Sequence, residues 1–154
     1  MAYANVTAAK NDGSKDGKIV SLAMADNVAI YKESLVCIDA SGYANFTPVA
    51  SKPFAGVAIE TVDNTLAGHT AGGKSVRVAT TGVHYFSFPA GGASVALIGS
   101  EVYWDDSADS TPVEVSASDQ GVGAKVGRIV EIVSATKVGV LIDGYAMNVD
   151  GQAN

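Results

Sequence analysis

The chain contains one order of short segments twice, and this internal repeat restricts its fold more than any other feature. A Ser, a four-residue strand pattern and an Asp occupy residues 34–39 and again residues 100–105. Each copy continues with a Thr-Pro-Val triplet, a glycine-centred segment and an alternating strand: 47–49 and 111–113, Gly56 and Gly127, 76–78 and 138–140. A β unit of about fifty residues is too small to bury a face alone. We therefore predict two duplicated β units, about 33–83 and 99–143, with generic β-meander spacing as the alternative.

The rest of the sequence predicts an all-β fold with little helix. Glycine occurs 17 times while aromatic residues reach only 7%, and this balance suits short strands joined by tight turns. No window of helical length has a 3.6-residue apolar period, so any helix should be short, near Leu66 or between Ala93 and Ile98. Two duplicated units would pack as a small β-barrel or a β-sandwich.

The two ends of the chain differ from its centre. Residues 1–17 are small and polar and predict an N-terminal arm, whereas the all-β domain spans 18–146 and a polar C-terminal tail spans 147–154. Lys10 and Lys15 of the arm and the adjoining Lys18, against Asp12 and Asp16, make this end of the chain slightly basic.

Net charge limits the partners that the chain can have. The formal charge is −6, which argues against a nucleic-acid backbone or an anionic membrane as a partner. The acidic stretch between Glu101 and Asp119 has no Lys or Arg and is interpreted as solvated loops rather than a cation site. The sequence shows no signal-peptide pattern and no apolar run of membrane-spanning length. We expect synthesis in the cytoplasm without export.

The chemistry-bearing residues form no catalytic pattern. His69 and His84 have no metal-ligand spacing, and the single cysteine, Cys37, lies inside an apolar strand. Residues 68–75 spell the phosphate-loop pattern Gly-x-x-x-x-Gly-Lys-Ser, but a strand rather than a helix is predicted to follow them. We therefore expect no enzyme activity, no catalytic residue, no metal site and no cofactor.

Aromatic and basic side chains are the candidates for an interface with another protein. Tyr103 and Trp104 are adjacent in a strand, so they point to opposite faces, and Tyr85 lies opposite the face shared by Phe86 and Phe88. One member of each set would fill the core while the other faces a partner, although packing within the chain explains both equally well. The interface candidates are Tyr3, Lys10, Lys15, Lys18, Tyr85, Tyr103 and Trp104.

The second half of the chain resembles the bacteriophage capsid decoration, or cement, proteins. It has a Gly-x-x-Val-Tyr-Trp-Asp strand at 99–105, a short strand at 113–115, a glycine-centred strand at 126–128 and a Val-x-Val-x-Ile strand at 138–142. The first half follows the same rhythm at 54–58 and 76–83. The resemblance implies a structural virion protein on the outer capsid surface. It also implies that the protein binds the major capsid protein, stabilises the shell and forms a homotrimer.

A carbohydrate- or ligand-binding β-sandwich is the alternative function. Such a module would belong to a phage tail or an adhesin, and it would use an exposed Trp104 together with the loop acids.

Overall fold

The described part of the chain is built almost entirely of short strands. The computed structural model describes residues 18–46, 52–89, 92–104, 115–116 and 125–144. Its elements are β1 (Ile19–Ala23), β2 (Val28–Ile30), β3 (Leu35–Ile38), β4 (Ala44–Asn45), β5 (Phe54–Ala58), β6 (Val62–Asn64), β7 (Ser75–Ala79), β8 (Val83–Ser87), a 3-10 turn η1 (Val95–Leu97), β9 (Glu101–Trp104), β10 (Val115–Ser116), β11 (Lys125–Ser134) and β12 (Lys137–Ile142). The predicted all-β class is confirmed.

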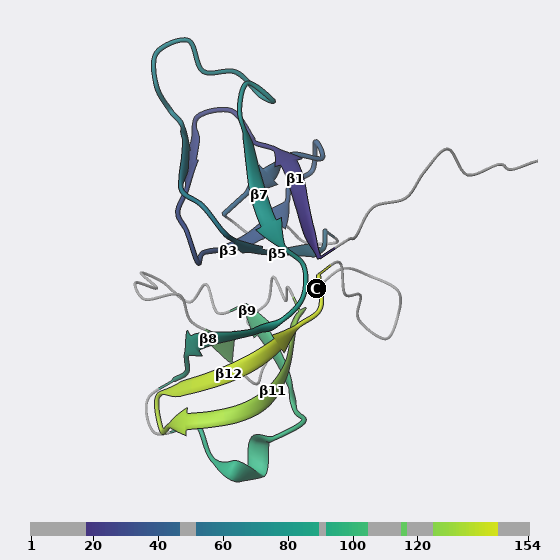
Figure 1. The fold of residues 1–154 in the computed structure, drawn as a ribbon, viewed down its shortest axis with the longest axis vertical. Coiled ribbons are helices and arrows are strands. Elements are labelled where there is room, and N and C mark those ends of the chain that lie inside the picture. Colours follow the sequence, from purple (N-terminus) through teal and green to yellow (C-terminus); the bar gives the residue numbers. More distant parts are fainter. Residues whose placement is uncertain (1–17, 47–51, 90–91, 105–114, 117–124, 145–154) are drawn as a thin grey trace, which may run out of the picture.

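The strands form two five-stranded antiparallel sheets and one two-stranded ribbon. The first sheet has the order β1-β7-β5-β3-β4, the second β10-β9-β11-β12-β8, and β2 pairs with β6. Read from β4 and from β10, the two orders are equivalent, with β3 in the place of β9, β5 in that of β11, β7 in that of β12 and β1 in that of β8. The sheets lie one above the other in a sandwich-like arrangement (Figure 1).

Equivalence between the two sheets extends to individual residue pairs. Val36 of β3 lies opposite Gly56 of β5, and Val102 of β9 lies opposite Gly127 of β11. A register shift accompanies each pair, so both glycine-containing strands carry an irregularity at the same place. The two glycines that the sequence repeat aligns therefore occupy the same position in their sheets.

The turn before β3 and the turn before β9 are also alike. The Glu33 N–H donates to Ala58 O at 2.7 Å, and the Gly99 N–H donates to Ile129 O at 2.8 Å. Both residues have left-handed backbone, with φ of 71° at Glu33 and 87° at Gly99. Glycine adopts this conformation readily, whereas Glu33 pays a steric cost to hold it.

Two clusters of buried apolar side chains stabilise the fold. The larger cluster lies between the sheets and joins Leu35, Phe54 and Val57 of the first sheet to Trp104 and Ile129 of the second, among others. The smaller cluster lies within the first sheet and under the β2–β6 ribbon, and includes Met24, Ile30, Ala55, Ala58, Val76 and Val78. All five residues of β5 are buried because this strand supplies side chains to both clusters.

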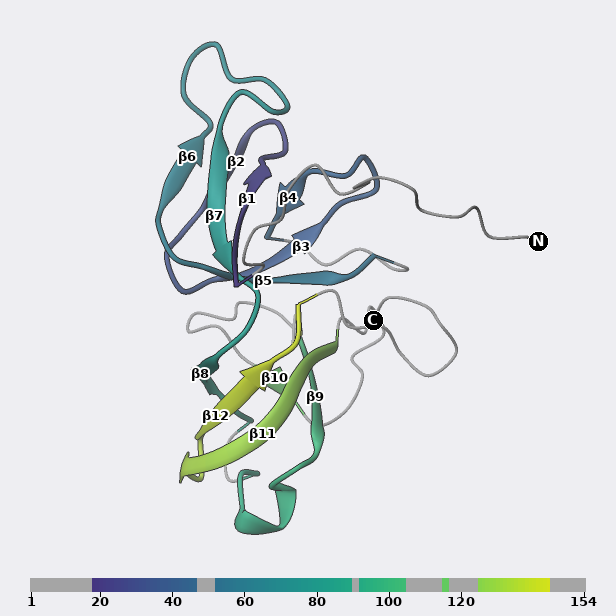
Figure 2. The same ribbon diagram turned by 45° about the vertical axis from the view of Figure 1, so that its right-hand side comes forward.

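The first sheet curls until its two edge strands meet. Met24, directly after β1, forms a parallel bridge with Ala44 of β4, and the Ala25 N–H donates to Ala44 O at 2.9 Å. Among the described residues no such bridge joins β8 to β10, the edge strands of the second sheet. Figure 2 shows β1 and β4 next to each other in the upper half, where the curl of the first sheet brings its two edges together.

One of the two helix positions expected from the sequence is helical. The η1 turn, Val95–Leu97, lies within the expected interval from Ala93 to Ile98. The expectation near Leu66 is wrong, because residues 66–68 form a bend and a turn in the loop that joins β6 to β7, where Leu66 is 58% exposed. No neighbouring element offers Leu66 an apolar surface that would stabilise a helical turn.

Candidate functional site

The basic interface candidates lie at the beginning of the chain. Tyr3, Lys10 and Lys15 lie outside the described residues. Lys18 is exposed immediately before β1, and its carbonyl oxygen accepts a hydrogen bond from the Thr80 N–H at 2.9 Å. The described structure therefore places Lys18 beside β7 and gives no position for the other three.

Strand β9 divides its side chains between the core and the surface. Val102 and Trp104 are buried in the cluster between the sheets, and Trp104 is only 8% exposed. Glu101 and Tyr103 point to the other face, where the Tyr103 hydroxyl donates to the Glu101 carboxylate at 3.3 Å. Of the two adjacent aromatic residues, Trp104 thus fills the core and Tyr103 lies on the outer face of the second sheet.

Glu101 is the centre of an ion-pair network that ties β9 to β11. Its carboxylate lies 2.9 Å from Lys125 Nζ and 3.0 Å from Arg128 Nη2. Arg128 also donates from Nη1 to Gly99 O at 2.9 Å. The hydrogen bond from Lys125, aided by the charge of Arg128, holds the pKa of Glu101 below its usual value of 4.5.

This network predicts a small stability contribution that depends on pH. Because the pKa of Glu101 is lowered by folding, the contribution is present above the unfolded-state pKa and is lost as pH falls through the folded-state pKa. We expect Glu101→Gln to cost less than about 1 kcal/mol near neutral pH, since the carboxylate is partly exposed. Urea denaturation as a function of pH should show the difference in free energy of unfolding between the variant and wild type becoming smaller below pH 4.5. Glu33→Gln is the control, as Glu33 has no ion-pair partner among the described residues. A gap that does not change with pH would contradict this account.

Tyr85 lies across the outer face of the second sheet. Its hydroxyl donates to Glu131 of β11 at 2.8 Å, and this hydrogen bond raises the pKa of Tyr85. Gly139 of β12 pairs with both residues and lies between them. A Cβ atom at Gly139 would lie 3.1 Å from the Tyr85 ring and 3.1 Å from Glu131 Cβ. The missing side chain therefore makes room for this cross-strand contact.

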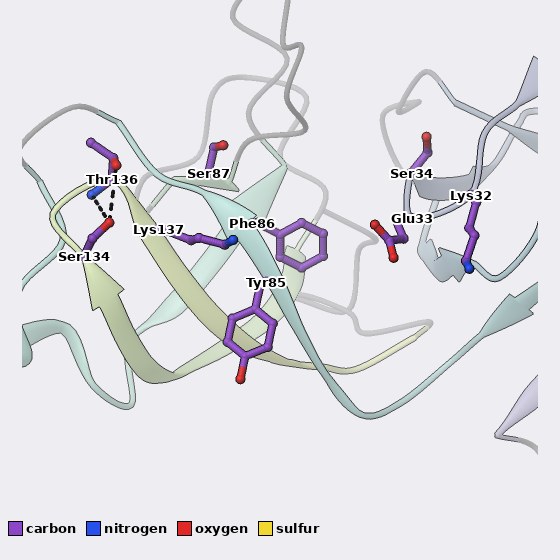
Figure 3. Close-up of a pocket in the computed structure, with 9 residues that line it drawn as sticks. All are labelled: Lys32, Glu33, Ser34, Tyr85, Phe86, Ser87, Ser134, Thr136 and Lys137. Atoms are coloured by element: carbon purple, nitrogen blue, oxygen red, sulfur yellow. Dashed lines mark hydrogen bonds between the residues drawn. The ribbon is translucent and has the colours of Figure 1, made fainter.

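A polar groove runs along β8 between the two sheets (Figure 3). Two adjoining hollows of about 470 and 420 Å³ share Glu33, Tyr85, Phe86 and Lys137 in their walls. The second sheet supplies one wall and residues 32–34 the other. Hydroxyl and amino groups predominate among the polar lining residues of the larger hollow: Lys32, Ser34, Ser87, Ser134, Thr136 and Lys137.

The phosphate-loop spelling at residues 68–75 does not have phosphate-loop structure. The segment connects β6 to β7, and a strand follows it instead of a helix. Lys74 Nζ donates to Asp63 O at 2.7 Å, so the lysine holds the loop closed on β6. His69 Nδ1 lies 2.6 Å from an Asp26 carboxylate oxygen and ties the same loop to the turn after β1. The segment therefore has a structural explanation.

The other chemistry-bearing residues are also held by local structure. Cys37 is buried in β3, and its thiol donates to Asn45 O at 3.5 Å. His84 Nε2 lies 3.3 Å from Thr81 O. Within the described ranges, no three His, Cys, Asp or Glu side chains gather where they could hold a metal ion. The described residues also include no helix with the length and apolar character needed to cross a membrane.

A two-sheet all-β protein is the class that the described residues define. Residues 14–144 match the family model of phage cement proteins, and the chain belongs to this family. No curated protein shows significant similarity to the chain. Membership gives the protein a structural role in a phage virion and makes it a component associated with the capsid.

The groove along β8 was not predicted from the sequence. Its walls come from residues 32–34, from β8 about fifty positions later and from the β11–β12 turn about a hundred positions later. Tyr85 is the one predicted interface candidate among its lining residues. No local pattern marks it, because its lining residues are far apart along the chain and meet only in the folded structure.

Proposed function

We propose that the protein binds the outer surface of the phage capsid through the major capsid protein and stabilises the shell, without enzymatic activity. The family match over residues 14–144 carries this proposal. Synthesis in the host cytoplasm and assembly as a homotrimer belong to the same proposal. Neither nucleic acid nor a membrane is a proposed partner, because the chain carries a net charge of −6.

The physical basis for stabilisation is linkage between binding and assembly. A protein that binds the assembled shell better than its separated subunits adds its binding free energy to the stability of the shell. The two sheets share one buried cluster, which favours a module that bridges neighbouring subunits without bending. Three identical copies would give such a bridge several attachment points and increase its avidity.

Capsids that lack the protein provide the direct test. We expect purified protein to co-sediment with these particles and to raise the temperature at which they release DNA, measured with a DNA-binding dye. Deleting residues 2–17 should weaken binding by about tenfold or more, since the proposed role of this arm is to add contacts with the shell. The thermal unfolding temperature of the deletion variant is the control and should be unchanged.

Two results would count against the proposal. If wild-type protein stays in the supernatant at concentrations well above those in an infected cell, capsid binding is wrong. If it binds but leaves the temperature of DNA release unchanged, shell stabilisation is wrong. Normal co-sedimentation of the deletion variant would remove the proposed role of residues 2–17 alone.

The carbohydrate-binding alternative lacks a specific observation in its favour. It depended on an exposed Trp104, and this side chain is buried in the cluster between the sheets. The loop acids between Asp105 and Glu114 lie outside the described residues. We therefore do not propose a carbohydrate as the partner.

A further inference from the structure

Strand β8 leaves the backbone of the second sheet open on one side. The Phe88 N–H donates to Thr136 O, and the Ile142 N–H donates to Gly82 O. Hydrogen-bonded and non-hydrogen-bonded residue pairs alternate between these two bonds along the β8–β12 register. Even-numbered positions of β8 thus bond to β12, whereas the N–H and C=O groups of Val83, Tyr85 and Ser87 point away from it. These groups have no hydrogen-bond partner in the described part of the chain.

The open edge is not on a flat surface but forms one side of the groove. All five residues of β8 line one or both of the hollows, with Glu33 of the turn before β3 and Val57 of β5 across from them. An added strand of five residues would extend about 17 Å along β8. In Figure 3 the Glu33 side chain points across this space toward Phe86 of β8, with Ser34 and Lys32 beside it.

The charges in the groove select the chemistry of its occupant. Lys32 and Lys137 stand on opposite walls, and neither forms an ion pair with a described residue. Glu33 is the one carboxylate among the residues that line the two hollows. The chain as a whole carries −6, so this groove is locally positive on an otherwise acidic protein. An incoming segment with carboxylates would be attracted here and repelled elsewhere.

The geometry points to β8 as a docking edge for an extended acidic segment of the capsid shell protein, which adds a strand to the second sheet. Main-chain hydrogen bonds to Val83, Tyr85 and Ser87 would hold the segment, and Lys32 and Lys137 would pair with its carboxylates. This inference rests on the proposed capsid binding and names the chemistry of the contact.

A second copy of this chain fits the groove less well. Pairing β8 with the β8 of another copy would bring together two locally positive grooves, which repel one another. The N-terminal residues 1–17 offer no net negative charge, since two lysines balance two aspartates. The groove therefore favours a partner whose sequence is more acidic than this arm.

Amide hydrogen exchange on the capsid tests the inference directly. Purified protein is bound to capsids that lack it, and its peptides are compared with those of the free protein. We expect slower exchange in peptides that cover residues 83–87, since new strand bonds protect the three open amides. Residues 19–23 of β1, the equivalent strand, should exchange as in the free protein. Capsid binding without protection of residues 83–87 would overturn the inference and leave the proposed function intact.

A proline substitution tests the edge independently. Ser87→Pro removes an N–H that points away from β12, so the β8–β12 bonds can remain while the open edge is blocked. We expect capsid affinity to fall by about tenfold or more. Ser21→Pro makes the same change at an outward position of β1 and should leave the affinity unchanged. Equal affinities for the two variants would contradict strand addition at β8.

Charge reversal covers the case in which Ser87→Pro disturbs folding. Lys32→Glu combined with Lys137→Glu should reduce capsid affinity by about tenfold at low salt, and the loss should shrink as salt rises. Lys52→Glu, outside the groove, is the control. An undiminished affinity of the double variant would overturn the acidic partner. Protection of residues 83–87 that appears without capsids and rises with protein concentration would instead make a second copy the occupant and contradict the inference.

Discussion

Gly127→Ala is expected to unfold the protein, or to lower its free energy of unfolding by about 3 kcal/mol or more. A Cβ atom at residue 127 would lie 2.1 Å from Leu141 O and 2.9 Å from Ile142 Cα. Both atoms belong to the backbone of β12, which cannot rotate away as a side chain could. Relief would require β11 and β12 to separate, and this would break the hydrogen bonds at the centre of the second sheet.

Gly99→Ala is the matched control for this substitution. Gly99 has a φ of 87°, and no atom lies within 4 Å of the position that its Cβ would occupy. The substitution should therefore lower the free energy of unfolding by only about 1 kcal/mol, which is the cost of a left-handed backbone at a non-glycine residue. Urea denaturation followed by circular dichroism compares the two variants. If Gly127→Ala proves no more destabilising than Gly99→Ala, the close approach of β11 to β12 is wrong.

Gly56→Ala should behave like Gly127→Ala. Its Cβ would lie 2.1 Å from Ala79 O in β7, the strand that corresponds to β12. Spacing along the chain pairs the two glycines, but it gives no reason why either must be glycine. That reason lies in the close approach of a neighbouring strand, which depends on register and irregularities set by contacts between distant segments.

Strand alternation predicts part of the candidate site. It places Tyr103 and Trp104 on opposite faces, because neighbouring side chains of a strand point in opposite directions. It does not identify which face is covered, since that depends on the other sheet. In the structure the larger cluster covers Trp104 and leaves Tyr103 beside Glu101. The same holds for Phe86, which is buried, and Tyr85, which is 52% exposed.

The groove could not be predicted in this way. Lys32 precedes the first repeat unit, whereas Lys137 begins the last strand of the second. Neither lysine belongs to a local pattern, because a single charged residue at a turn is ordinary in any soluble protein. They become neighbours only when the two sheets pack, and packing of this kind is decided by the whole core rather than by a short segment.

Trp104→Ala is expected to lower the free energy of unfolding by about 3–5 kcal/mol, because it empties a large volume in the core between the sheets. Trp104 belongs to the cluster that includes Leu35 and Phe54 of the first sheet. Tyr103→Ala truncates the adjacent aromatic residue on the outer face and should cost about 1 kcal/mol or less. Circular dichroism in urea measures both variants without depending on tryptophan fluorescence.

The manner of unfolding in Trp104→Ala also tests whether the two sheets are one cooperative unit. Because the larger cluster draws side chains from both sheets, a cavity there should lower the protection of β7 and β12 amides together in hydrogen exchange. The smaller cluster holds Val76 and Val78 of β7 but no side chain of the second sheet. If β12 exchanges quickly while β7 keeps its wild-type protection, the first sheet is stable on its own. The two sheets would then unfold independently, and the core between them would contribute little to the stability of the first sheet.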